Sequence, residues 1–298
     1  TQAVATANES ISVGHVSNAS GFGSIAIGST SSASGTDSIA MAYESNASAP
    51  NSTAIGRSSL ATSENAQAFG VLSNADAANA IAFGTVACST QANGIAVGTL
   101  SAATGVNATA IGTDAGALAA NSTAIGACSR AGSNNAVAMG YTANAIDVNS
   151  IAIGTQTFAT GHNSTAIGTQ AKACGVNSVA IGPASNANGT NASAIGLNAF
   201  ANGANSQAFG RDAYANGVDS YAGGVNATAF GTNSFAFGRD AHANGTDSFA
   251  FGDGSRATTL ASNSSTFGTD ASVDSPCSMA LGMNAKVFAD STKIGRAH

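Results

Sequence analysis

The stretch Asn149-Ser150-Ile151-Ala152-Ile153-Gly154 decides the fold, because it recurs along the chain at a fixed interval. It returns as Asn163-Ser164-Thr165-Ala166-Ile167-Gly168 and as Asn177-Ser178-Val179-Ala180-Ile181-Gly182, each time 14 residues further on. The closing position runs from Gly14 to Gly252, which is 17 steps of 14 residues without an insertion. A fixed short period is the signature of a repeat architecture and argues for one elongated body.

The pattern inside one repeat predicts its local structure. We number the positions as slots 1 to 14, ending on the glycine. The apolar or small residues in slots 3 and 5, and in slots 11 and 13, are spaced by two, which is the period of a β-strand. Slots 7–9 and 14 carry Gly, Asn and Asp, which tolerate positive φ and close turns. The sequence therefore predicts an all-β, parallel β-roll, a solenoid of 14-residue coils in which each strand pairs in register with its counterpart in the next coil.

Slot 9 is Asn in twelve consecutive repeats, from Asn51 to Asn205. Two structural interpretations stay open. The side-chain amides could form a ladder along the stacked turns, as in other parallel β structures. Alternatively, each Asn could simply hold a left-handed turn.

Residue size predicts which slots face inward. Slots 3, 5, 10 and 12 hold mostly Ala and Ser, which fit the thin lumen of a short coil. Slot 13 then points outward and forms an apolar ridge. Large exposed apolar patches are rare on soluble monomers, so we expect copies of the chain to cover the ridge around a closed axis. Two copies would leave one flank open, which favours a homotrimer. The residues predicted at the trimer axis are Ile27, Ile55, Phe69, Phe83, Ile111, Ile125, Ile153, Ile167, Ile181, Ile195, Phe209, Phe237 and Phe251.

Outward aromatic residues in slot 4 form a candidate contact patch, consisting of Phe158, Phe200 and Tyr214. Phe200 and Tyr214 belong to consecutive repeats, so we expect their rings to stack. The patch could contact a partner, or it could pack against a neighbouring subunit.

Composition excludes several classes of function. Only 8% of the residues are charged and the net charge is −6, with no face of clustered Lys or Arg, so we expect no nucleic-acid partner. No run of about 20 apolar residues occurs, so we expect no membrane contact by this segment.

Catalytic and metal-ligating groups are scattered along the chain. We therefore expect solvated histidines, unpaired thiols, no catalytic or metal site, no cofactor and no enzymatic activity. These residues are His15, His162, His242, His298, Cys88, Cys128, Cys174 and Cys277.

The Asn-Ser-x-Ala-Ile-Gly hexamer, the 14-residue period and the Ala-x-Ala-x-Gly half-repeat together resemble the YadA-like heads of trimeric autotransporter adhesins. The resemblance covers about residues 1–282. It implies a left-handed roll, a trimer with the Ile/Phe ridge at the three-fold axis, and a segment anchored in the bacterial outer membrane through a region outside this chain. It also implies display at the cell surface, a role in virulence, and adhesion to host extracellular-matrix proteins or to other host or abiotic surfaces.

At a few positions the sequence departs from the repeat, and each departure predicts a local change in structure. Gly223 replaces the bulky residue of slot 13 and should leave a gap in the ridge, and Ala42 replaces a turn glycine. The repeat that follows Gly252 has 16 residues. We therefore expect a regular head over residues 1–252 and an irregular end over residues 253–298, with a candidate transition to a neck.

Two other functions are compatible with a repetitive solenoid. One is the structural rod of a phage tail fibre or spike, where similar repeats occur. The other is an ice-binding solenoid, which needs a flat array of Thr. Slot 11 offers Thr53, Thr109, Thr123 and Thr165, but Ile, Gln and Phe interrupt the series. The adhesin head is therefore favoured.

Overall fold

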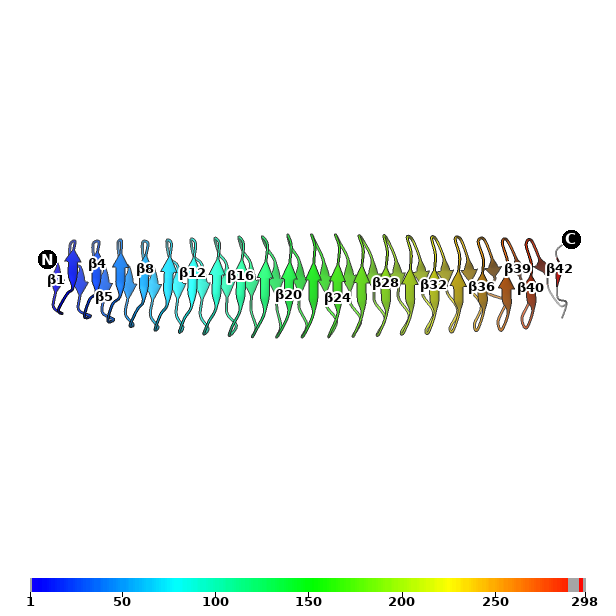
Figure 1. Cartoon of the computed structure of the whole chain (residues 1–298), viewed down its shortest axis with the longest axis horizontal. Coiled ribbons are helices and arrows are strands. Elements are labelled where there is room, and N and C mark those ends of the chain that lie inside the picture. The colour runs from blue at the N-terminus through cyan, green and yellow to red at the C-terminus, as the bar shows by residue number, and fades with distance from the viewer. Residues whose placement is uncertain (1, 289–294, 297–298) are drawn as a thin grey trace. The chain divides into compact units, whose positions relative to one another are not determined.

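The computed structural model describes residues 2–288 and 295–296. It comprises two compact units, Thr1–Asn149 (unit 1) and Ser150–His298 (unit 2). Every regular element of the described residues is a β-strand, and no helix occurs among them (Figure 1). The predicted all-β class is confirmed. The predicted division into residues 1–252 and 253–298 stays a prediction, and part of it lies outside the described residues.

Each coil of unit 1 contributes one long strand over slots 11–13 and one short strand over slots 4–5. The long strands are β2 (Ile11–Val13), β4 (Ile25–Ile27), β6 (Ile39–Met41), β8 (Thr53–Ile55), β10 (Gln67–Phe69), β12 (Ile81–Phe83), β14 (Ile95–Val97), β16 (Thr109–Ile111), β18 (Thr123–Ile125) and β20 (Val137–Met139). The short strands are β1 (Val4–Ala5), β3 (Asn18–Ala19), β5 (Ser32–Ala33), β7 (Asn46–Ala47), β9 (Leu60–Ala61), β11 (Asn74–Ala75), β13 (Cys88–Ser89), β15 (Ala102–Ala103), β17 (Gly116–Ala117), β19 (Arg130–Ala131) and β21 (Asn144–Ala145).

Unit 2 repeats the same alternation of long and short strands. The strands that correspond to the long strands of unit 1 are β22 (Ile151–Ile153), β24 (Thr165–Ile167), β26 (Val179–Ile181), β28 (Ser193–Ile195), β30 (Gln207–Phe209), β32 (Tyr221–Gly223), β34 (Phe235–Phe237), β36 (Phe249–Phe251), β38 (Ser265–Phe267), β40 (Met279–Leu281) and β42 (Gly295–Arg296). Its short strands are β23 (Phe158–Ala159), β25 (Lys172–Ala173), β27 (Asn186–Ala187), β29 (Phe200–Ala201), β31 (Tyr214–Ala215), β33 (Thr228–Ala229), β35 (His242–Ala243), β37 (Arg256–Ala257), β39 (Ser272–Val273) and β41 (Lys286–Val287).

In each unit the strands form two parallel ladders, which we call the long-strand ladder and the short-strand ladder. Within unit 2, Ala166 of β24 pairs with Ala180 of β26, and Phe200 of β29 pairs with Tyr214 of β31. Identical slots therefore lie on neighbouring rungs, about 4.8 Å apart. The predicted in-register pairing of successive coils is confirmed.

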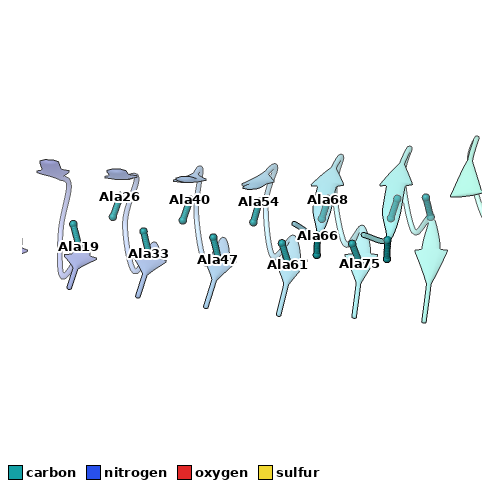
Figure 2. Close-up of a cluster of buried hydrophobic side chains, with 13 residues drawn as sticks. Ala19, Ala26, Ala33, Ala40, Ala47, Ala54, Ala61, Ala66, Ala68 and Ala75 are labelled. Atoms are coloured by element: carbon teal, nitrogen blue, oxygen red, sulfur yellow. The ribbon is translucent and has the colours of Figure 1, made fainter. Parts of the chain in front are cut away.

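The lumen between the ladders is filled by the small side chains of slots 3, 5, 10 and 12. Figure 2 shows the alanines of slots 5 and 12 in unit 1, such as Ala33 and Ala26, pointing toward one another between the ladders. Both are fully buried. Buried serines bond within their own turn: Ser31 Oγ donates to the Gly28 carbonyl at 2.9 Å and Ser38 Oγ donates to the Gly35 carbonyl at 2.7 Å. The same bond therefore recurs seven residues apart, so each coil consists of two similar half-coils.

Three slots take a left-handed backbone, one of which the sequence did not reveal. Slots 9 and 14 behave as predicted, with Asn163 at φ 55° and Gly168 at φ 126°. Slot 2 is also left-handed, at Val86 (φ 58°) for example. It is the half-coil equivalent of slot 9. Gly161 in slot 7 instead avoids positive φ, and a Cβ there would collide with the Gly175 carbonyl.

The slot 9 asparagines form the amide ladder and hold left-handed turns, so both interpretations hold. In unit 1, Asn79 Nδ2 donates to Asn93 Oδ1 at 3.1 Å, and Asn93 donates onward to Asn107 at 3.0 Å. In unit 2 the same series ends on a carboxylate, because Asn205 Nδ2 donates to Asp219 Oδ1 at 2.9 Å. Each amide thus donates along the stacked turns while its backbone closes the turn.

Candidate contact surfaces

The ridge predicted from slot 13 lies on the outer face of the long-strand ladder of each unit. Alternation along each strand puts slot 12 inside and slots 11 and 13 outside. In unit 1, Phe83 is 56% exposed, and in unit 2 Ile167 is 36% exposed. The outward direction of the ridge follows directly from this exposure. Its role as a trimer axis stays a prediction. The ridge members are Ile27, Ile55, Phe69, Phe83, Ile111 and Ile125 in unit 1, and Ile153, Ile167, Ile181, Ile195, Phe209, Phe237 and Phe251 in unit 2.

The ridge of unit 2 extends beyond Phe251, the last residue that the sequence predicts for it. Phe251 pairs with Phe267, and Phe267 pairs with Leu281, so the column continues through β38 and β40. Leu281 is 55% exposed. The repeat of residues 253–268 is two residues longer than the others, but the long-strand ladder stays intact. Beyond the insertion, Ala261 takes the slot 7 position and stacks against Gly245 of the preceding coil. Gly268 and Gly282 close these two repeats in the sequence, and they are the signal that could have located Phe267 and Leu281 in slot 13.

The expected gap at Gly223 is wrong. The Tyr221 side chain lies over this glycine, so that a Cβ at residue 223 would come within 2.5 Å of Tyr221 Cε1 and 3.0 Å of Phe237 Cδ2. Tyr221 also stacks on Phe235, with ring centroids 4.6 Å apart. The large residue has moved from slot 13 to slot 11 of the same strand, and the outer face stays filled.

The predicted stack on the other face is confirmed. Phe200 and Tyr214, on neighbouring rungs of the short-strand ladder, have ring centroids 5.6 Å apart and planes inclined by 27°. Phe230, one coil further on in slot 6, adds a third ring with its centroid 5.2 Å from Tyr214. Asn202 Nδ2 donates to the Tyr214 hydroxyl at 3.0 Å and holds the ring in place. We call Phe200, Tyr214 and Phe230 the aromatic patch.

Phe158, the third residue of the predicted contact patch, lies apart from these rings. It is 37% exposed and pairs with Lys172, and the rung of Asn186 follows before Phe200 is reached. The structure therefore separates Phe158 from the aromatic patch and adds Phe230, which is not one of the three predicted contact residues.

His242 is not the solvated side chain expected from the sequence. It is half-buried on the short-strand ladder, with Nδ1 hydrogen-bonded to Thr228 Oγ1 at 2.5 Å. Burial lowers the pKa of His242, and the nearby Arg256 lowers it further, while Asp240 acts in the opposite direction. Burial and Arg256 thus both favour the neutral imidazole. The hydrogen bond to Thr228 links two neighbouring rungs of the short-strand ladder.

Among the described residues, the other candidate histidines and cysteines form no metal-binding cluster, and His298 lies outside the described residues. Among residues 2–288, no cluster of three or more His, Cys, Asp or Glu side chains could hold a metal ion. All four thiols are free, and Cys88 is half-buried. Burial raises the pKa of Cys88, with a smaller contribution from Asp76. No helix long and apolar enough to cross a membrane occurs in the described part of the chain.

Carboxylates gather on the turns and alternate there with amides. In slot 2 of unit 2, Asn198 donates to Asp212 at 3.1 Å and Asn226 donates to Asp240 at 2.9 Å. In slot 9, Asn233 likewise donates to Asp247 at 2.9 Å. Each of these three carboxylates thus has an amide donor on the preceding rung. The ridge and the aromatic patch lie on the outer faces of the two ladders, between the turns.

Comparison with known proteins identifies the repeat. The family model described as "YadA head domain repeat (2 copies)" matches more than half of the chain. The matched segments are residues 19–41, 43–59, 61–87, 103–127, 131–157, 159–185, 173–199, 187–213, 208–234, 215–241 and 231–255.

One solved structure that matches is the collagen-binding domain of the Yersinia adhesin YadA. It is 20% identical to this chain, and the match covers 65% of this chain and 68% of that one, with a TM-score of 0.22. No curated protein matches the chain.

Proposed function

Because the chain belongs to the YadA head domain repeat family, we propose that it forms the binding head of a trimeric adhesin displayed on a bacterial cell surface. In this proposal three copies associate through the ridge. The opposite faces and the turns remain available for host extracellular-matrix proteins or other surfaces. A segment outside residues 1–298 anchors the head to the outer membrane. The head acts by binding, without catalysis.

The observation that carries the proposal is the ridge. Slot 13 places a large apolar side chain on the outer face of coil after coil, with Ile181 at 37% and Phe237 at 44% exposure. A soluble monomer rarely leaves such a column in contact with water. Association around a three-fold axis covers the same column in every copy, as cyclic symmetry requires.

Solution mass tests the trimer. Light scattering should give a mass near three times the 28.5 kDa of the chain. The substitutions Ile167→Asp and Ile181→Asp together should release monomers, because they put carboxylates on the covered column. The matched control is Val176→Asp, since Val176 is 44% exposed but lies in slot 8, on a turn. A monomeric wild-type chain would remove the main physical support for the proposal.

Adhesion is tested on the trimer itself. Immobilised collagen, fibronectin and a bare polystyrene surface serve as probes, with a folded protein of similar net charge as the blank. Retention on at least one probe above the blank supports an adhesin head. A trimer that binds none of them would favour the structural rod instead.

A further inference from the structure

The outer face of the short-strand ladder in unit 2 presents a column of side chains on consecutive rungs. Backbone pairing holds all of these rungs in register. From Lys172 to Arg256 the column covers seven rungs, whose six steps span about 29 Å. The column consists of Lys172, Asn186, Phe200, Tyr214, Thr228, His242 and Arg256.

The centre of this column is aromatic and held in place. Phe200 stacks on Tyr214, and Tyr214 contacts Phe230. Asn188 Nδ2 donates to Asn202 Oδ1 at 3.0 Å, and Asn202 in turn donates to the Tyr214 hydroxyl. Rings that are already fixed lose little conformational entropy when a ligand binds, which is the behaviour of binding hot spots.

The charges around the column are segregated. Slots 4 and 6 carry no carboxylate between residues 172 and 256, and Lys172 and Arg256 are exposed at the two ends. The carboxylates of the same coils, including Asp212 and Asp240, lie on the turns. The face is thus weakly positive in a chain whose net charge is −6.

We propose that this face binds a linear polysaccharide with sparse negative charge, such as one carboxylate per disaccharide. The C–H groups of pyranose rings pack against the aromatic patch, because aromatic faces carry partial negative charge. Sugar hydroxyl and acetamido groups bond to Asn186, Asn188 and Thr228, and the carboxylates pair with Lys172 and Arg256. A chain that repeats along its length suits a column that repeats on every rung. This inference rests on the proposed adhesin function and names a ligand class for it.

The small number of cations on this column predicts a ligand with sparse negative charge. Lys172 and Arg256 are the only cations in slot 4 of these coils, apart from the His242 position. The neighbouring turns carry Asp212, Asp219, Asp240 and Asp247, and the turn cations Arg211 and Arg239 are already paired with Asp212 and Asp240. A densely charged chain, such as heparin or single-stranded DNA, would set several anionic groups near these carboxylates for every cation it met. Like charges at this range repel, so the face favours the sparsely charged chain.

The test uses a hyaluronan decasaccharide, which carries one carboxylate per disaccharide, titrated into the intact trimer by calorimetry. The substitutions Phe200→Asn and Tyr214→Asn together should weaken binding about tenfold, as expected for loss of a central aromatic hot spot. Asn already occupies slot 4 at Asn144 and Asn186, so the variant should fold. The matched control is Tyr141→Ala, because Tyr141 is 56% exposed but lies in slot 1 of unit 1.

The charged ends are tested separately. Lys172→Gln with Arg256→Gln should weaken hyaluronan binding and remove most of its salt dependence. Cellohexaose, which is uncharged, should bind more weakly than hyaluronan to the wild type.

Three results would overturn the inference: no binding of hyaluronan, equal binding by the Phe200/Tyr214 variant, or tighter binding of heparin or oligo-dT. If the trimer still adheres to collagen or fibronectin in any of these cases, the ligand class is wrong and the adhesin function stands.

Discussion

Tyr221 covers Gly223 two residues further along the same strand, and the two positions compensate for each other. A Cβ at residue 223 would meet Tyr221 Cε1 at 2.5 Å. In β24, by contrast, β-branched Thr165 in slot 11 accompanies Ile167 in slot 13, and in β34 both slots hold phenylalanine. Tyr221 in slot 11 therefore fills the outer face at the one strand of this region whose slot 13 is glycine.

The first prediction tests this compensation. Gly223→Ile alone should destabilise unit 2 by about 1–3 kcal/mol, because the new side chain overlaps the Tyr221 ring. Adding Tyr221→Thr should restore most of the loss, since the strand then has the Thr-Ala-Ile pattern of residues 165–167. Thermal unfolding followed by circular dichroism measures both variants. Equal midpoints for the wild type and the single variant would contradict the compensation.

The alternation of Asn and Asp on the turns predicts a charge effect. Asn205→Asp should cost about 0.2–1 kcal/mol, because it removes the amide that donates to Asp219 and places a like charge on the neighbouring rung. The loss should shrink in high salt. Asn135→Asp is the control, since its ladder partners on both sides, Asn121 and Asn149, are neutral amides. Chemical denaturation at two salt concentrations measures the difference, and an equal cost at both sites would count against charge repulsion.

Ala42 holds a backbone conformation that suits glycine. Its φ of 115° lies where other coils of unit 1 have glycine, such as Gly56 at 135°. Ala42→Gly should therefore stabilise unit 1 by about 1 kcal/mol despite the greater freedom of glycine in the unfolded chain. Ala40→Gly, at a buried strand position with ordinary φ, should destabilise it by about the same amount. A lower thermal midpoint for the Ala42 variant would show that the φ strain is relieved elsewhere.

His242 should make stability depend on pH. Its pKa is lowered in the folded state from the usual 6.5, first by burial and then by Arg256. The unfolded chain then binds the proton more readily, so stability rises with pH in the window below 6.5. The contribution of the neutral imidazole is full above pH 6.5 and is lost as the pH falls toward the folded pKa.

The measurement is the unfolding midpoint from pH 7.5 down to pH 5. His242→Asn should flatten the part of the decrease that begins near pH 6.5, and Asn is a common slot 4 residue. His15→Asn serves as the control, since His15 lies on an exposed turn. An unchanged pH profile in the His242 variant would assign the decrease to other groups.

The sequence alone determined the coil. A strict period, small residues in slots 3, 5, 10 and 12, and Gly, Asn or Asp in the turns admit one arrangement, in which strands stack on their own copies. Each coil sees the same neighbours as the next, so local residue size and φ tolerance dictate the lumen, the two ladders and the outward ridge. The pairing of Ala166 with Ala180 and the stack of Phe200 on Tyr214 follow from the period itself.

Only the tertiary structure decided features that depend on contacts between slots. The left-handed backbone at Val86 has no signal in the residue itself, because stacking of successive turns imposes on it the conformation that Asn198 and Asp212 adopt in the same slot. Tyr221 fills the space above Gly223, and Phe230 reaches Tyr214 from slot 6, because ring size lets a side chain cross from its own slot to another. A period predicts what repeats, whereas such contacts arise where single residues break the repeat.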